Sequence, residues 1–199
     1  MRNWFSSDFH WGHSNILKMC NRDFVDIIEH DRAIIENHNS LVAENDISWN
    51  LGDIAYRCSP DYVAKKLACL NGKIMIVMGN HDKPLRQAYE MGFLNKMLNS
   101  GKIEIIGGEM AIKDHTLYIA KTIEINGQRI FISHMAHKTW INSFRGSWSL
   151  HGHSHSKIIS VYKSIDVGVD AVPNKFFPIS FEEIKDIMNI KNQDFSETE

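Results

Sequence analysis

The chain contains few residues that cross-link or interrupt a fold. It has three cysteines and four prolines among 199 residues. Cys20, Cys58 and Cys69 form no CxxC pair and leave an odd count, which is typical of reduced thiols rather than of a disulfide framework. This pattern predicts a cytoplasmic protein.

The chain also lacks long hydrophobic runs and a strong net charge. Residues 1–5 have no apolar h-region of a signal peptide, and the most apolar run, residues 74–78, has the length of a buried strand. We therefore expect no membrane association. The formal net charge of −2 creates no global field that would attract nucleic acid or an anionic membrane. The length fits one domain, predicted over residues 1–191, followed by a polar acidic tail over 192–199.

Strand and helix patterns alternate in the first half. Apolar runs predict strands over 4–7, 46–51 and 74–78, and the segments 14–19, 26–43 and 59–70 have helical spacing or caps. Strand–helix–strand order favours a parallel sheet with right-handed crossovers.

The second half has a different character. Asn126-Gly127 lies between the β-rich runs 118–125 and 128–133, which predicts a hairpin. A capping box at Ser180–Glu183 predicts a last helix that reaches about residue 189. Further short strands are expected near residues 102–106, 147–150, 158–162 and 164–167.

Histidine is abundant and concentrated. Five of the eleven histidines fall between His134 and His155. Imidazole is costly to bury without partners, and neutral imidazole is the commonest side-chain metal ligand. In Gly152-His153-Ser154-His155 two imidazoles occupy one face of an extended chain, and the glycine permits close approach of the backbone. These features favour metal binding. The role of His151, on the same face, stays open between support of the site and packing.

Two acidic motifs in the first half can supply oxygen ligands. Asp8-x-His10 places a carboxylate and an imidazole on the same side of the chain, where they can chelate one cation. The alternative is an N-capping aspartate beside an unrelated histidine. Gly52-Asp53 closes an apolar strand, and its carboxylate has two oxygens that could bridge two metals; the alternative is a common turn.

Two further motifs follow predicted strands. In Gly79-Asn80-His81-Asp82, Asn80 offers a carbonyl ligand, His81 a proton or positive charge, and Asp82 a partner to orient His81. An Asx-turn is the alternative. His134 ends an apolar strand, where it is either a ligand or a hydrogen-bonded histidine at a sheet end. Mixed oxygen and imidazole ligands without cysteine suit manganese, iron, zinc or nickel rather than a structural zinc site.

The order D-x-H, G-D, G-N-H-D, H, G-H-x-H resembles the calcineurin-like metallophosphoesterase superfamily over residues 8–155. The surrounding residues, such as His10-Trp11-Gly12-His13 and Val167-Gly168-Val169-Asp170, resemble a compact microbial and phage-type branch of predicted phosphoesterases. The resemblance implies an α/β fold, a four-layer α-β-β-α sandwich with two mixed β-sheets.

The resemblance also implies two divalent metal ions, with manganese expected and iron, zinc, nickel or magnesium as alternatives. It implies that Asp53 is shared between two ligand sets. One set would comprise Asp8, His10, Asp53 and His155, and the other Asp53, Asn80, His134 and His153. His81 would lie beside the substrate without binding metal, oriented by Asp82. The implied reaction is phosphoester hydrolysis by in-line attack of a hydroxide bridging the two ions.

The substrate is less constrained by the sequence. We expect a phosphorylated small molecule, either a small phosphodiester or a nucleotide, with His13, Arg57 and Arg145 as candidate contacts; packing or simple solvation of these side chains is the alternative. A phosphomonoesterase or protein phosphatase stays open. A nuclease acting on nucleic-acid ends is disfavoured, because no basic stripe interleaves with aromatics. A non-catalytic scaffold would be expected to have lost ligands, and the oligomeric state is open.

Overall fold

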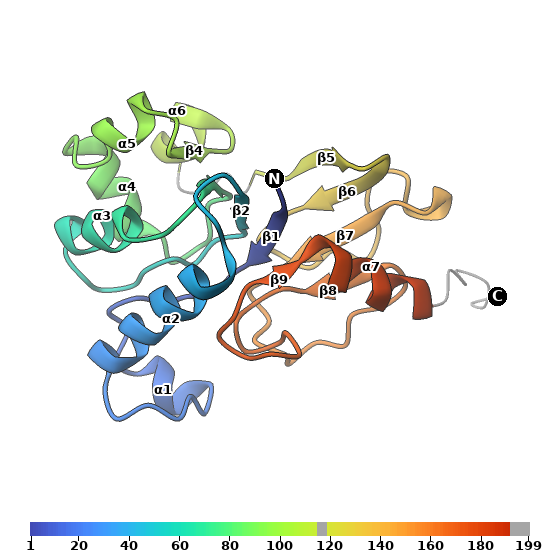
Figure 1. Cartoon of the computed structure of the whole chain (residues 1–199), viewed down its shortest axis with the longest axis horizontal. Coiled ribbons are helices and arrows are strands. Elements are labelled where there is room, and N and C mark those ends of the chain that lie inside the picture. The colour runs from blue at the N-terminus through green and yellow to red at the C-terminus, as the bar shows by residue number, and fades with distance from the viewer. Residues whose placement is uncertain (115–118, 192–199) are drawn as a thin grey trace.

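The computed structural model describes residues 1–114 and 119–191, which form two sheets packed face to face (Figure 1). Two predictions extend outside these ranges, the start of the hairpin strand at residue 118 and the tail over 192–199. The first sheet has the order β4-β3-β2-β1-β9. Its parallel strands are β1 (Asn3–Ser6), β2 (Ile47–Asn50), β3 (Lys73–Ile76) and β4 (Ile103–Ile105), and β9 (Ile179–Ser180) is antiparallel to β1.

The second sheet has the order β5-β6-β7-β8. Its strands are β5 (Lys121–Ile125), β6 (Gln128–Ile132), β7 (Trp148–His151) and β8 (Ser164–Asp166). The hairpin predicted at Asn126-Gly127 joins β5 to β6, the one antiparallel pair of this sheet. The pairs β6–β7 and β7–β8 are parallel. Both sheets are therefore mixed, as expected.

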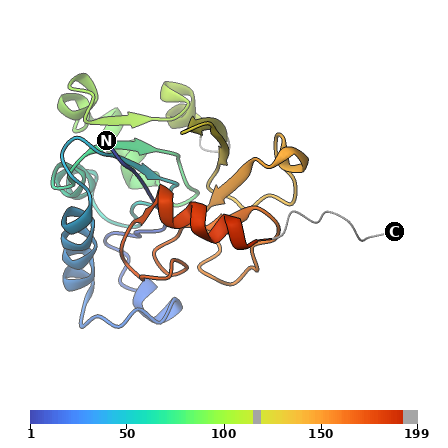
Figure 2. The same cartoon turned by 45° about the vertical axis from the view of Figure 1, so that its right-hand side comes forward.

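The helices lie mainly beside the first sheet, on the left of Figure 1. They are α1 (Ile16–Met19), α2 (Ile27–Leu41), α3 (Pro60–Ala68), α4 (Lys83–Glu90), α5 (Asn95–Asn99) and α6 (Gly108–Lys113). Side chains cap the starts of several helices. Asp26 accepts from the first-turn amides of α2, Ser59 caps α3, and Ser180 with Glu183 forms a reciprocal capping box at α7 (Phe181–Ile190). In Figure 2, α7 runs across the front of the molecule.

Alternation along the strands divides the core into two layers. In β3, Ile74 and Ile76 face the helices, where they join a buried cluster with Leu67 of α3 and Leu85 of α4. Met75 faces the other way, into a cluster between the sheets. This second cluster contains Phe5, Trp49, Ile132, Leu150 and, from α7, Ile184. Because successive strand residues point to opposite faces, a fully apolar strand is expected where both faces are covered.

The expected fold class, an α/β sandwich of two mixed sheets with helices, is confirmed. The strand predicted over 158–162 is wrong: this segment is irregular, and Ile158 and Ile159 are exposed. Apolar β-branched composition favours a strand only where a partner is available, and β7 is already paired by β6 on one side and β8 on the other. Among the described residues, no helix has both the length and the apolar composition needed to cross a bilayer.

Candidate metal centre

The five sequence motifs all follow the carboxyl ends of strands. Asp8 follows β1, Asp53 follows β2 and Asn80 follows β3 in the first sheet, whereas His134 follows β6 and the pair His153 and His155 follows β7 in the second. Because parallel strands end at one edge of a sheet, the loops after them meet there. The structure brings the ligand atoms of Asp8, His10 and His155 within 4.8 Å of one another, and does the same for Asp53, His134 and His153.

Asp53 lies between the two groups. Its Oδ2 is 3.6 Å from Nε2 of His10, and its Oδ1 is 3.4 Å from Nε2 of His134. The carboxylate is buried, so its charge needs compensation from its neighbours. The two oxygens of one side chain thus point to different sets of imidazoles.

His134 presents a defined ring nitrogen to this cluster. Its Nδ1 lies 2.8 Å from the carbonyl oxygen of Leu51 and donates to it, which leaves the lone pair of Nε2 free. Nε2 is 3.0 Å from Oδ1 of Asn80. Two acceptors that face each other at this distance are compatible with a shared cation or a shared proton.

The fit of a metal to these residues can be tested on His10. Its ring is 2% exposed, and among the described residues its Nε2 has no hydrogen-bond partner. A buried polar nitrogen without a partner is costly, and a cation held with Asp8, His155 and Asp53 would satisfy it. The donor set, carboxylate and imidazole, is the one that divalent transition metals accept. The residues therefore fit a metal centre.

Backbone strain is concentrated at the same place. A left-handed backbone with positive φ is uncommon for residues other than glycine and tends to occur at functional sites. Here it occurs at five of the predicted ligands, namely Asp8 (61°), His10 (54°), Asp53 (54°), His153 (68°) and His155 (48°). Folding has to offset the cost of these conformations, so the packing around the site holds the predicted ligands in place.

Two glycines allow the motifs to pack against one another. A Cβ at Gly79 would lie 2.2 Å from Oδ1 of Asp53, and one at Gly152 would lie 2.0 Å from Oγ of Ser7 and 2.6 Å from Oδ2 of Asp8. Real Cβ atoms do not approach so closely. Gly152, which the sequence linked to close approach of the backbone, thus admits the first motif.

Comparisons with known proteins identify the family of the chain. A family model described as calcineurin-like phosphoesterase matches residues 1–172. The chain belongs to the calcineurin-like phosphoesterase family. An uncharacterized protein of Methanocaldococcus jannaschii is 30% identical over 88% of this chain and 85% of its own length. The gene 66 protein of Mycobacterium phage L5 is 25% identical over 94% of this chain and 93% of its own.

A solved structure shares the fold. The crystal structure of a protein of unknown function from Aquifex aeolicus superposes with a TM-score of 0.62 at 22% identity, covering 94% of this chain and 98% of that one. The archaeal and phage relatives are consistent with the compact microbial and phage-type branch that the sequence indicated.

Asp82, a phosphoesterase motif residue that we expected to orient His81, makes different contacts. Its two carboxylate oxygens accept backbone N–H groups of Asp53, Ile54 and Gly79 at 2.7–2.9 Å, and among the described residues it has no hydrogen bond to His81. Burial and the nearby Asp53 charge raise the pKa of Asp82 to about 6. Asp82 therefore orders the loop that carries Asp53.

His81 lies at the edge of the centre. Its backbone N–H donates to Oδ1 of Asp53 at 2.8 Å, and its half-buried ring is 5.6 Å from the ring of His10 between centroids. The ring of Tyr56 packs against it edge-on at 4.6 Å. In the described part of the chain no side chain hydrogen-bonds to the ring of His81, so its nitrogens are available to a ligand.

The candidate substrate contacts differ in position. His13 is beside the centre, with Nδ1 3.4 Å from Nδ1 of His10 and its ring 4.5 Å from that of Tyr56. Arg57 is exposed and lies over Tyr56, 5.1 Å from the ring centroid. Arg145 is exposed in the short 3-10 helix Ser143–Arg145, and no contact with the centre is found for it among the described residues.

Burial and hydrogen bonding shift the pKa of several predicted ligands. Burial raises the pKa of Asp8 to about 7. Burial opposes the charge on His134 and His155, but hydrogen bonds to Asp53 and Asp170 outweigh it and raise their pKa to about 9 and about 10. The raised pKa values favour protonated His134 and His155 when no cation is bound, and a divalent ion that binds there would have to displace these protons.

Several residues at the centre were not found from the sequence as parts of the site. Tyr56 has no motif signal, and Arg22 is an isolated basic residue in the sequence. Cys20 lies within 4.8 Å of the ligand atoms of His155 and Asp170. For Asp170 the sequence offered only the motif Val167-Gly168-Val169-Asp170, which gave no role.

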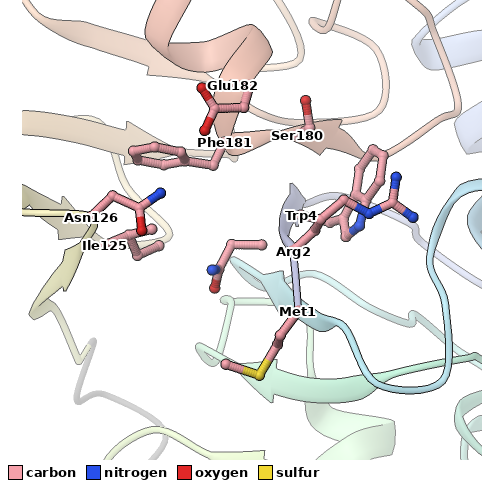
Figure 3. A pocket seen from close by; sticks show the side chains of 9 residues that line it. Met1, Arg2, Trp4, Ile125, Asn126, Ser180, Phe181 and Glu182 are labelled. Atoms are coloured by element: carbon pink, nitrogen blue, oxygen red, sulfur yellow. The ribbon is translucent and has the colours of Figure 1, made fainter.

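Cavities also occur away from the centre, among the described residues. Figure 3 shows one of about 340 Å³ between the start of β1, the β5–β6 turn and the start of α7, lined by residues such as Arg2, Asn126 and Glu182. It is at the amino end of β1, whereas Asp8 follows the carboxyl end. A second, of about 400 Å³, includes His151 and the exposed Ile158 and Ile159. His151 lines this second cavity and is not a member of either group of predicted ligands.

Proposed function

We propose that the chain is a dinuclear metal-dependent phosphoesterase that acts on small phosphodiesters or nucleotides. The observation that carries the proposal is the position of Asp53, whose two oxygens face His10 and His134 respectively. A buried carboxylate with an imidazole group on each side is suited to join two cations.

The proposed ligands divide as the family pattern implies. Asp8, His10, His155 and Asp53 would hold one ion, and Asp53, Asn80, His134 and His153 the other. Manganese is our first choice because carboxylate, amide and imidazole donors suit it. Bound divalent ions would neutralise phosphoryl oxygens and lower the pKa of a water molecule.

The protein's own groups would prepare the site for an anionic substrate. His81 is held by its backbone N–H on Asp53, and its ring nitrogens are free of protein hydrogen bonds among the described residues. A protonated ring nitrogen would stabilise charge that develops on the phosphoryl group or donate its proton to the leaving oxygen. Asp82 would contribute indirectly, by fixing the backbone that presents Asp53.

The surroundings favour a small substrate with an aromatic part. His13, Tyr56 and His81 form a continuous wall of rings with centroids 4.5 and 4.6 Å apart. Such a wall can stack against a nucleobase, and the exposed Arg57 over Tyr56 adds a positive charge.

Metal analysis and hydrolysis assays test the proposal. Purified protein loaded with manganese should bind two ions per chain and hydrolyse a chromogenic phosphodiester, and chelation should abolish the activity. A panel of mono-, di- and cyclic phosphates then identifies the substrate class. Two bound ions without hydrolysis of any phosphate would favour a scaffold and contradict the proposal.

His81→Ala separates catalysis from metal binding. Because His81 lies beside the centre without a place in either ligand group, the variant should retain both ions. Its turnover should fall by about 10²–10⁴-fold, the usual contribution of a general acid. Loss of both ions from His81→Ala would instead make His81 a ligand.

Asp53→Asn tests the shared carboxylate. It should lose metal and activity together, because an amide replaces one of two anionic oxygens and its NH₂ repels a cation. A fully active Asp53→Asn variant would refute the bridging role.

A further inference from the structure

Arg22 is a buried cation that links segments far apart in the sequence. Its side chain is fully buried, and its guanidinium donates to both carboxylate oxygens of Asp170, from Nε at 2.9 Å and from Nη2 at 2.7 Å. The two residues are 148 positions apart. A bidentate arginine–carboxylate pair of this kind fixes the orientation of both planar groups.

Asp170, held in this orientation, also contacts a predicted metal ligand. Its Oδ2 is 2.7 Å from Nδ1 of His155, so Nδ1–H donates to the carboxylate and the lone pair of Nε2 is left for a cation. An imidazole without such a partner can rotate or change tautomer. The same carboxylate oxygen therefore accepts from both Arg22 and His155.

The two terminal nitrogens of Arg22 also contact the first motif. Nη2 donates to the carbonyl oxygen of Asp8 at 2.8 Å, and Nη1 donates to that of Phe9 at 3.0 Å. Asp8 precedes His10 by two residues, and both have left-handed backbones. Arg22 thus contacts the backbone that presents Asp8 and, through Asp170, the ring of His155.

A further contact, with His30, holds Arg22 in place. Nη1 is 2.8 Å from Nε2 of His30, whose Nδ1 is 2.7 Å from Oδ1 of Asp31. Burial lowers the pKa of His30, which matches a neutral ring that accepts from Arg22 and donates to Asp31. Asp31 also accepts the backbone N–H of Gly12 at 2.8 Å, so the chain just after the first motif is tied to the same network.

The cluster of Cys20, His155 and Asp170 is explained better by the Arg22–Asp170 ion pair than by a third metal ion. Cys20, His155 and Asp170 offer ligand atoms within 4.8 Å of one another. Both oxygens of Asp170, however, already accept from the Arg22 guanidinium. A metal ion there would compete with a fixed positive charge for the same carboxylate.

We propose that Arg22 and Asp170 form a positioning pair that holds the ring of His155 and the backbone of Asp8 in the geometry of one metal site. The inference rests on the proposed metal centre. Outer partners of metal ligands commonly change metal affinity by about 10–100-fold. We therefore expect Asp170→Asn and Arg22→Met to lower the affinity for one of the two bound ions by about 10–100-fold.

The matched control is Asp46→Asn. Asp46 is also buried and paired with an arginine, with Oδ2 3.3 Å from Nε of Arg2, and its Oδ1 accepts the backbone N–H of Arg2 at 2.7 Å. It lies at the amino ends of β1 and β2, away from the ligands. Asp46→Asn should lower stability without changing the affinity for either ion.

Titration calorimetry with manganese distinguishes the outcomes. Wild-type protein that binds no manganese would overturn the proposed function itself. Wild-type binding of two ions together with unchanged affinity in Asp170→Asn would overturn the positioning role alone. Arg22→Lys keeps the charge but loses the bidentate geometry of the guanidinium. Its manganese affinity should therefore lie between those of wild type and Arg22→Met. Loss of an ion from Cys20→Ala but not from Asp170→Asn would also contradict the proposal.

A measurement on the wild-type protein covers the case in which these variants do not fold. In nitrogen-15 spectra of the zinc-loaded protein, which is diamagnetic, His155 should carry a slowly exchanging proton on Nδ1 and bind metal through Nε2. A metal-bound Nδ1 would place the ion where Asp170 now accepts, and would overturn the proposal.

Discussion

Substitution of Gly79 by alanine tests whether close packing of two motifs sets the metal site. The new Cβ would lie 2.2 Å from Oδ1 and 2.3 Å from the backbone nitrogen of Asp53, where ordinary contact begins near 3.4 Å. Gly79 does not have a positive φ. The backbone itself therefore accepts alanine, and the effect comes from the clash alone.

The magnitude follows from these distances. Asp53 or the Gly79 loop has to move by about 1.2 Å to relieve the contact, whereas a functional site tolerates displacements of about 0.5 Å. Overpacking of this kind costs about 1–3 kcal/mol of unfolding free energy. A ligand misplaced by about 1 Å is expected to reduce turnover by about 10²-fold.

Two assays follow the effect. Urea unfolding in the presence of a chelator measures the packing cost, and manganese titration measures the site. Gly79→Ala should be less stable than wild type and should also bind manganese more weakly.

Gly101→Ala is the matched control. A Cβ at Gly101 meets nothing within 4 Å, but its φ of +72° makes alanine unfavourable by about 1–2 kcal/mol. It should therefore lose comparable stability and keep wild-type metal affinity. If Gly79→Ala binds manganese as tightly as Gly101→Ala does, the packing argument is refuted.

Two further predictions concern stability away from the centre. Burial lowers the pKa of His38 to about 4, below its ordinary value of 6.5. The unfolded chain then binds more protons between these values, so stability should fall by about 3 kcal/mol as the pH drops from about 6.5 to about 4. His38→Gln should make urea-unfolding stability less dependent on pH in this window, and an unchanged slope would assign the loss to another group. Ser180→Ala removes the cap of α7 and should cost about 1 kcal/mol. In a thermal unfolding assay of both variants, Glu183→Gln, which keeps an acceptor, should cost less stability than Ser180→Ala. The reverse order would contradict the capping role.

Much of the architecture was predictable because it depends on local pattern. Strand–helix alternation up to residue 78 indicated the parallel sheet, and Asn126-Gly127 indicated the hairpin between β5 and β6. The capping box at Ser180 predicted the start of α7. Where local pattern misled, at 158–162, the missing factor was a partner strand, which no local window contains.

The functional groups were predictable in type but not in arrangement. The motifs place Asp, Asn and His side chains after strand ends, and parallel strands bring such ends together whatever the details of packing. Asp82 shows the limit of this reasoning. Its neighbour in sequence is His81, but its carboxylate binds amides around Asp53, because the buried N–H groups of that loop need an acceptor.

The sequence alone therefore determined which residue types could bind metal and the order of elements that carries them. Only the tertiary structure decided that Asp53 separates two imidazole groups and that Arg22 meets Asp170 across 148 residues. The physical reason is the range of the interactions involved. Helices, turns and caps form between near neighbours in sequence, whereas a buried charge is paired by whichever distant segment the packed core brings beside it.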